Sequence, residues 1–139
     1  MILVDTNVLS AMMRSTVEPA VVRWFDAQPP ESVWTTTITI FEIRFGLALL
    51  APGRRRNHLH DAFERAIEDI LGRRVLPFDR TAAETAAEIA ARQRKLGQPV
   101  EIRDVQIAGI AAARKAIVAT RNIRHFQSLG ITLVDPWHA

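Results

Sequence analysis

Short apolar runs that stop at a polar residue recur along the chain, and each has the length of a β-strand. The first run, residues 1–4, ends at Asp5, and a later run is rich in β-branched residues. Such runs predict buried strands. The predicted strands cover residues 1–4, 32–36, 75–78, 117–119 and 131–134.

Between these runs, apolar residues recur at helical spacing. Asp5 or Thr6 could cap the first helix, which ends at Met13. The further predicted helices extend from Pro19 to the Pro29–Pro30 pair, from a Thr39 N-cap to Pro52, and over residues 54–71, 81–96 and 104–115. Strands that alternate with helices predict an α/β fold, with a central parallel five-stranded sheet flanked by helices on both faces.

The length and composition predict one globular domain. A chain of 139 residues fits a single domain over residues 1–139, and a hydrophobic share of 48% argues against disorder. The absence of cysteine excludes a disulfide framework, thiolate metal ligands and a cysteine nucleophile. Asp5 interrupts the first apolar run with no basic segment before it, unlike a signal peptide, and no apolar stretch has a membrane-spanning length. We therefore expect a cytoplasmic protein with no membrane partner.

Acidic residues follow or flank several of the predicted strands. Asp5 ends the first strand, Glu42 lies in the first turns of the helix after the second, and Asp104 begins the helix that leads into the fourth. Thr120, Arg121 and Asn122 follow the fourth strand. In open parallel sheets, ligands bind beyond the carboxyl ends of the strands, so we expect these side chains at one edge of the sheet.

Three carboxylates in one pocket predict a divalent cation. Mg²⁺ and Mn²⁺ prefer carboxylate and water oxygens, and such an ion can orient a water molecule and stabilise charge on a phosphate. Without a cation the acids repel one another, so at least one should have a raised pKa. The formal net charge of +3 favours polyanionic partners slightly. The pattern suits phosphodiester hydrolysis.

Each acid also has a purely structural interpretation. Asp5 could simply cap the following helix, and Glu42 could be a solvated helix residue. Asp104 could be an N-cap or could pair with Arg103. The coincidence of all three acids at strand-end positions favours the metal cluster, although the spacing alone is only moderately specific.

Several segments resemble a known family. They are residues 2–7 (ILVDTN), 39–42 (TIFE), 103–108 (RDVQIA), 119–122 (ATRN) with His125-Phe126, and 134–137 (VDPW). They resemble the PIN-domain family over the whole length of the chain, and within it the VapC-type toxins of the FitB-like branch. The resemblance implies a PIN-like three-layer fold and a Mg²⁺- or Mn²⁺-dependent endoribonuclease. It also implies a DNA-binding antitoxin of the VapB or FitA type, operator DNA bound through that antitoxin, and a homodimer that assembles into higher oligomers.

By the same resemblance, Asp5, Glu42 and Asp104 match the metal-binding acids of the family. Asn122 occupies the place of a fourth acid, and His125 stands where many relatives have aspartate. One firmly bound ion is therefore expected, and a second is left open. Thr6, Asn7, Thr120 and Arg121 are candidates for positioning water or substrate, with Arg124 also adjoining the expected site.

Other features are less informative. Arg54, Arg55 and Arg56 could bind RNA phosphates, but a solvated helix start explains them as well. The four histidines are not at metal-site spacing. Most of the large apolar residues on neighbouring helices should be core, while some could line a groove for an antitoxin helix. These residues are Trp24, Phe25, Phe41, Phe45, Leu49 and Leu50.

The leading hypothesis is a hydrolase, the ribonuclease toxin described above. One alternative is a non-catalytic PIN-like subunit that binds a DNA-binding antitoxin and supports operator repression, which the missing fourth acid keeps open. Another is a receiver-like or phosphatase α/β domain. This last class usually pairs its strand-end aspartate with a second acid and a late lysine, whereas Val4 precedes Asp5 and Lys115 lies within a predicted helix.

Overall fold

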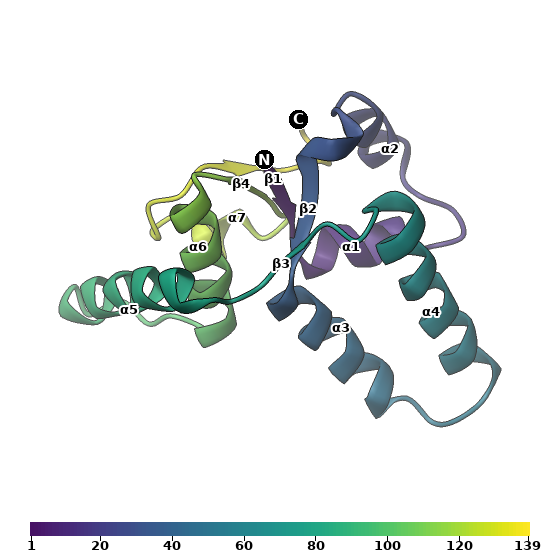
Figure 1. Ribbon diagram of the computed structural model, residues 1–139, viewed down its shortest axis with the longest axis horizontal. Helices are drawn as coiled ribbons and strands as arrows, with labels where there is room; N and C mark the ends of the chain where they lie inside the picture. The colour runs from purple at the N-terminus through teal and green to yellow at the C-terminus, as the bar shows by residue number, and fades with distance from the viewer.

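A parallel sheet in the strand order β3-β2-β1-β4-β5 forms the centre of the fold. The computed structural model describes residues 1–139 (Figure 1). Its strands are β1 (Ile2–Val4), β2 (Val33–Thr36), β3 (Val75–Leu76), β4 (Ile117–Ala119) and β5 (Leu133–Val134). The predicted α/β class and the five parallel strands are confirmed.

Helices cover both faces of the sheet. The first group is α1 (Thr6–Met12), α2 (Pro19–Asp26), α3 (Thr37–Leu49) and α4 (Arg54–Arg65), which continues into a wider helical turn at Ala66–Ile70. The second group is α5 (Arg80–Lys95), α6 (Ile102–Arg114) and α7 (Ile123–Phe126). Figure 1 shows the two groups on opposite sides of the strands, which gives three layers.

Neighbouring residues of β1 point into two separate cores. Leu3 belongs to a core cluster that includes Ile110 of α6 and Phe126 of α7. Val4 belongs to a second cluster that includes Val8 of α1. Successive side chains of a strand face opposite sides of the sheet, so β1 has no solvent-facing side. This explains why the strand is a continuous apolar run.

Some predicted helix boundaries were wrong. The N-cap of α3 is Thr36, whose hydroxyl accepts a hydrogen bond from the Thr39 backbone N–H at 3.1 Å, so the predicted cap is the residue that is capped. Three consecutive threonines made this position ambiguous. Glu101, not Asp104, caps α6, and α7 was not predicted because its four residues show no helical period.

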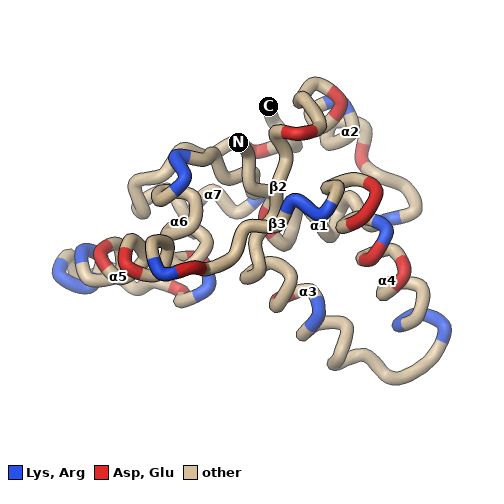
Figure 2. Tube along the Cα trace, in the orientation of Figure 1, with Lys and Arg blue, Asp and Glu red and all other residues tan.

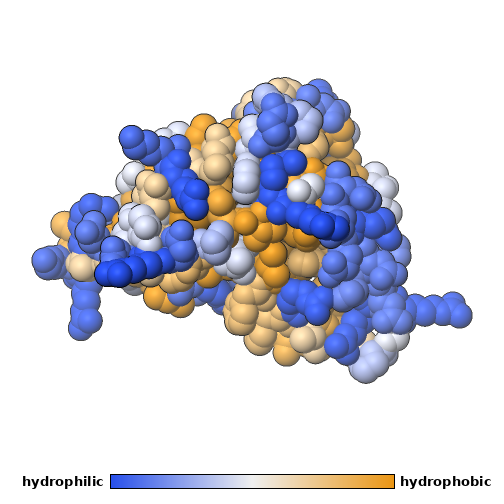
Figure 3. All heavy atoms as spheres, viewed as in Figure 1, coloured by the Kyte–Doolittle hydropathy of each residue, from blue (hydrophilic) through white to orange (hydrophobic).

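One expected core face is largely exposed. Phe41, Phe45 and Leu49, spaced four residues apart on α3, have exposed fractions of 57%, 51% and 71%, whereas Trp24 is buried. The rings of Phe41 and Phe45 stack with centroids 5.9 Å apart. Figure 2 shows that α3 carries few charges compared with α4 and α5, and Figure 3 shows apolar residues gathered over it.

None of the helices combines the length and the apolar character that crossing a bilayer requires.

Candidate functional site

A cavity of about 200 Å³ lies where β1 ends and where α3 and α6 begin. It brings together all three predicted acids and three of the other candidates. Its lining consists of Asp5, Thr6, Asn7, Glu42, Glu101, Arg103, Asp104, Ile107, Asn122, His125 and Phe126. Thr120 and Arg121 do not line it.

Asp5 is buried at the junction of β1 and α1, with an exposed fraction of 5%. Its backbone N–H donates to the Ala119 carbonyl of β4 at 3.1 Å, and its Oδ1 accepts from the Val8 N–H at 3.0 Å. It therefore caps α1, as one interpretation predicted, and still faces the cavity. Burial raises the pKa of Asp5 from 3.8 to about 6, and a hydrogen bond from Thr120 opposes that shift. The pKa is raised in the predicted direction, but its main cause is burial, and the charge of Glu42, which represents the expected repulsion between acids, contributes less.

Asp104 lies in the first turn of α6, and its side chain does not cap the helix. The Glu101 carboxylate caps the helix instead, because its Oε2 accepts from the backbone N–H groups of Arg103 at 2.8 Å and Asp104 at 3.1 Å. Oδ2 of Asp104 lies 3.2 Å from Nδ1 of His125. Burial, followed by the charge of Glu101, raises the pKa of Asp104, and the contact with His125 opposes this rise.

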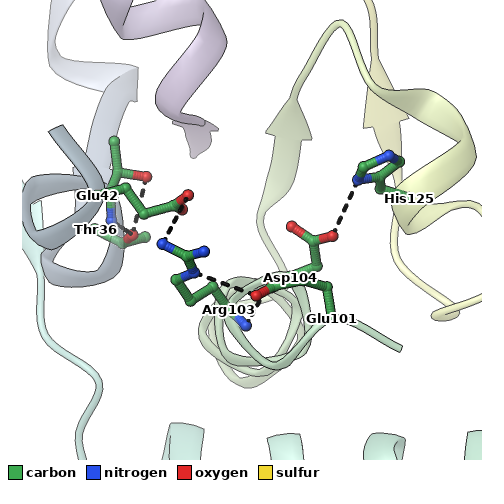
Figure 4. Close-up of polar contacts among 7 residues, drawn as sticks. Thr36, Glu42, Glu101, Arg103, Asp104 and His125 are labelled. Atoms are coloured by element: carbon green, nitrogen blue, oxygen red, sulfur yellow. Dashed lines mark hydrogen bonds and ion pairs between the residues drawn. The ribbon is translucent and has the colours of Figure 1, made fainter. Parts of the chain in front are cut away.

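Glu42 faces the cavity from α3, and the exposed fraction of its side chain is 23%. Its Oε2 lies 3.9 Å from Nη1 of Arg103, whose Nε donates to Oε1 of Glu101 at 3.2 Å (Figure 4). The alternative pairing of Asp104 with Arg103 was therefore wrong, since Arg103 bridges Glu42 and Glu101. Sequence reasoning missed Glu101, although an acid three residues before Asp104 at a helix start is a capping signal.

The predicted polar side chains around the acids have different environments. The Thr120 hydroxyl oxygen accepts from the Asn122 N–H at 2.9 Å, which orders the turn after β4. Oγ1 of Thr6 is buried and has no hydrogen-bond partner. Asn7 and Asn122 line the cavity, as expected.

Arg121 does not face the cavity. Its guanidinium carbon lies 4.7 Å from the ring centroid of Trp137, and the backbone N–H of Trp137 donates to Oδ1 of Asp135 at 2.9 Å. Arg121 therefore packs against the C-terminal segment through a cation–π contact. Lys115, the lysine relevant to a phospho-acceptor mechanism, is also outside the cavity lining.

The cavity suits a cation chemically, although its acids do not converge on one point. Hard divalent ions prefer carboxylate oxygens, the pKa of both Asp5 and Asp104 is raised, and the Thr6 hydroxyl is unpaired. No three histidine, aspartate or glutamate side chains lie close enough together to hold an ion in this arrangement. The role of Asp5, Glu42 and Asp104 as ligands stays a prediction.

A larger cavity of about 430 Å³ adjoins this one between α1, α3 and α4. Thr6 and Glu42 line both cavities. Half of the residues that line the larger cavity are hydrophobic, among them Ile43, Leu47 and Leu59. An apolar space therefore opens directly beside the acidic one.

Comparisons with known proteins give consistent matches. The family model described as PIN domain matches residues 2–131. The plasmid stability protein StbB of Pseudomonas syringae pv. tomato is 40% identical over 139 residues, and the alignment covers 100% of both chains. VapC ribonuclease Y4jK of Sinorhizobium fredii is 36% identical, with 99% of this chain and 98% of that protein covered. Toxin FitB of Neisseria gonorrhoeae is 36% identical, with 99% of each covered.

Solved structures agree with these matches. FitAcB from Neisseria gonorrhoeae superposes with a TM-score of 0.89 at 36% identity, covering 100% of both chains. FitAB bound to an IR36 DNA fragment superposes with a TM-score of 0.88 at 36% identity, covering 100% of this chain and 97% of that one. The predicted three-layer architecture is thus shared along the full chain.

Proposed function

The chain belongs to the PIN-domain family, and from that premise we propose that it is a metal-dependent endoribonuclease that acts as a toxin controlled by an antitoxin. The names of its relatives, a VapC ribonuclease and the toxin FitB, support the activity and the biological role. The proposed reaction is hydrolysis of RNA phosphodiester bonds.

The observation that carries this proposal is the gathering of Asp5, Glu42 and Asp104 in one cavity at the carboxyl end of β1. The three acids come from sequence positions far apart, and two of them have a raised pKa. Such perturbed carboxyl groups in a cleft are typical of functional sites. Structural capping explains Asp5 alone and does not explain the other two.

Asp5, Glu42 and Asp104 would hold a Mg²⁺ or Mn²⁺ ion. When bound, the ion would supply a Lewis acid that stabilises negative charge on the phosphate and lowers the pKa of a water molecule. The protein would fix the acids: the α1 cap holds Asp5, and the Glu101 cap leaves the side chain of Asp104 free. Thr6 and Asn122 could orient water in the cavity, because both line it.

We further propose that an antitoxin controls access to this site and carries the complex to operator DNA. The relative FitAB has been solved bound to DNA, which supports this role. The apolar cavity beside the acids offers a place for a segment of such a partner. A homodimer of the chain is also expected.

Cleavage of RNA by the purified chain, free of any partner, tests the enzymatic proposal. We expect cleavage with Mg²⁺ or Mn²⁺, none with EDTA, and none by Asp5→Asn or Asp104→Asn. Asp26→Asn provides the matched control, because Asp26 is exposed at the end of α2, far in sequence from the three acids. This variant should cleave RNA as the unaltered chain does. Cleavage in EDTA, or by either cavity variant, would contradict the mechanism.

The non-catalytic alternative keeps one supporting observation, namely that the acids are not assembled as a ligand set. It predicts no RNA cleavage by the free chain under any metal condition. It also predicts that Asp5→Asn still tightens the binding of the antitoxin to operator DNA in a mobility-shift assay. Loss of cleavage only in the acid variants would exclude it.

A further inference from the structure

We propose that Arg103 is a substrate-binding residue whose guanidinium holds a phosphate group of the RNA at the acidic cavity. This inference rests on the proposed function, because it assigns a substrate contact within the same site. It concerns a residue that neither the strand-end pattern nor the motif matches selected for that role.

The charge of the cavity favours such a contact. Four carboxylates line it, from Asp5, Glu42, Glu101 and Asp104, and Arg103 is its single Lys or Arg side chain. A metal ion would offset only part of the negative charge that an incoming phosphate meets. An arginine within the lining is therefore placed to favour the substrate over repulsion by the acids.

The hydrogen bonds of Arg103 leave its outer edge available. An arginine carries five N–H donors, and one of them, on Nε, donates to Glu101 at 3.2 Å. Nη1 lies 3.9 Å from Glu42, which is an ion-pair distance but is too long for a hydrogen bond. The two terminal nitrogens can thus donate in parallel to two phosphate oxygens, the geometry in which arginine binds phosphate best.

Glu101 fixes the position of this guanidinium. One oxygen of its carboxylate caps the backbone of α6 while the other accepts from Nε of Arg103 (Figure 4). The hydrogen bond to Glu101, followed by the charge of Glu101, raises the pKa of Arg103, so the side chain remains a cation. The exposed fraction of the Arg103 side chain is 38%, which leaves it accessible to a ligand.

The other arginines near the site do not fit this role. Arg121 packs on Trp137, and Arg124 is exposed outside the cavity lining. The competing explanation is that Arg103 only neutralises Glu42 and Glu101. That structural role would affect folding or metal binding, but it would leave the salt dependence of RNA binding unchanged.

Fluorescence anisotropy with a labelled single-stranded RNA 20-mer of mixed sequence distinguishes these explanations. The parent is Asp5→Asn, which should not cleave, with Mn²⁺ present. Adding Arg103→Gln should raise the dissociation constant about tenfold and reduce the salt slope by ~0.7, the value for one lost phosphate contact on a single strand. Arg103→Lys should keep the slope and lose part of the affinity, because the charge stays and the planar fork is lost.

Two controls make the result specific. Arg80→Gln removes an equal charge from the exposed Arg80–Glu84 pair on α5 and should leave both quantities unchanged. Calorimetric titration with Mn²⁺, on chains with Asp5 intact, should show that Arg103→Gln binds the ion at least as well as the unaltered chain. Weaker RNA binding would then not reflect a lost metal.

An unchanged salt slope and an affinity within twofold of the parent would overturn the role of Arg103. If the parent binds RNA and the Asp5-intact chain cleaves it, that result refutes this inference alone. If the intact chain neither binds nor cleaves RNA with Mg²⁺ or Mn²⁺, the proposed function itself fails, and this inference fails with it.

Discussion

Nδ1 of His125 lies 3.2 Å from Oδ2 of Asp104, so that an imidazole of the short helix α7 faces a carboxylate of α6 across the candidate site. The exposed fraction of the His125 side chain is 59% and that of Asp104 is 18%. The pair gives Asp104 a partner that is neutral or positive, where a further carboxylate would repel it.

Replacing His125 with aspartate should therefore change the response of the protein to metal. The variant His125→Asp places a second carboxylate beside that of Asp104. Because like charges repel, the metal-free variant should unfold at a temperature a few degrees lower than the unaltered protein. An added carboxylate ligand should also tighten Mn²⁺ binding about tenfold, since affinity for hard cations rises with ligand charge. Thermal unfolding in EDTA and calorimetric titration with Mn²⁺ measure the two effects.

The neutral variant His125→Asn separates charge from the loss of the imidazole. It should bind Mn²⁺ with an affinity close to that of the unaltered protein. If His125→Asn loses most of its Mn²⁺ affinity and aspartate does not restore it, the imidazole itself is a ligand, and the role assigned here to carboxylates is incomplete.

The raised pKa of Asp5 predicts how stability depends on pH without metal. Burial raises it from 3.8 to about 6, so between these values the folded state binds more protons than the unfolded state. The contribution of Asp5 to the free energy of unfolding should fall as pH rises from about 4 to 6 and then stay constant, a loss of about 3 kcal/mol. The pKa of Asp104 is also raised, so Asp104 should add to this loss of stability with rising pH.

Asp5→Asn should remove this dependence while preserving the α1 cap, because asparagine caps helices as well as aspartate does. Urea unfolding at pH 4 and pH 7 in EDTA measures the change. We expect the variant to be more stable than the unaltered protein at pH 7 and similar to it at pH 4, with Asp26→Asn unaffected. An Asp5→Asn variant that is less stable than the unaltered protein at pH 7 would show that burial of the charged Asp5 carboxylate does not destabilise the fold.

The sequence predicted the frame of the fold because that frame depends on local patterns. The runs that became β1 and β4 are buried on both faces, so they are continuously apolar, and β1 ends where the chain meets the cavity. The order of the strands is different, because it depends on which strand edges pair, and no single segment records that choice. The edge strands β3 and β5, with two residues each, were overpredicted in length.

Site residues could be predicted where the residue type limits the chemistry, and they were missed where long-range contacts decide a side chain's role. The grouping of Asp5, Glu42 and Asp104 could be predicted because all three are carboxylates near strand ends. Arg121 was assigned to the substrate because it follows β4, but Trp137, sixteen residues later, holds its guanidinium. The role of Arg103 depends on two side chains from α3 and the α6 cap, which only the folded chain brings together.

Divalent ions should stabilise the folded chain. An ion that binds only the folded state raises the free energy of unfolding by about 2.7 kcal/mol at 100 times its dissociation constant. The thermal midpoint should therefore rise with added Mn²⁺ and return to its starting value with excess EDTA. Asp104→Asn should show a much smaller rise, whereas Asp26→Asn should respond fully. An equal rise in Asp104→Asn would place the stabilising ion outside the cavity.

Helix α5 packs closely against α6, the helix that carries Asp104 and Arg103. Gly109 of α6 is buried, and a Cβ there would lie 2.6 Å from the Ala82 carbonyl oxygen and 2.6 Å from Cβ of Ala86. Alanine in a helix is normally more stable than glycine by about 1 kcal/mol. Here the clash with backbone should reverse the sign, so Gly109→Ala should destabilise the protein by about 1–3 kcal/mol.

Gly46 of α3 is the matched control, because a Cβ at that position meets nothing within 4 Å. Gly46→Ala should stabilise the chain by about 0.5–1 kcal/mol, since only the helix propensity changes. Urea unfolding of both variants measures the contrast, and RNA cleavage should fall in Gly109→Ala because α6 must shift away from α5. If Gly109→Ala gains stability as Gly46→Ala does, the two helices can separate at little cost, and α5 does not fix the position of Asp104.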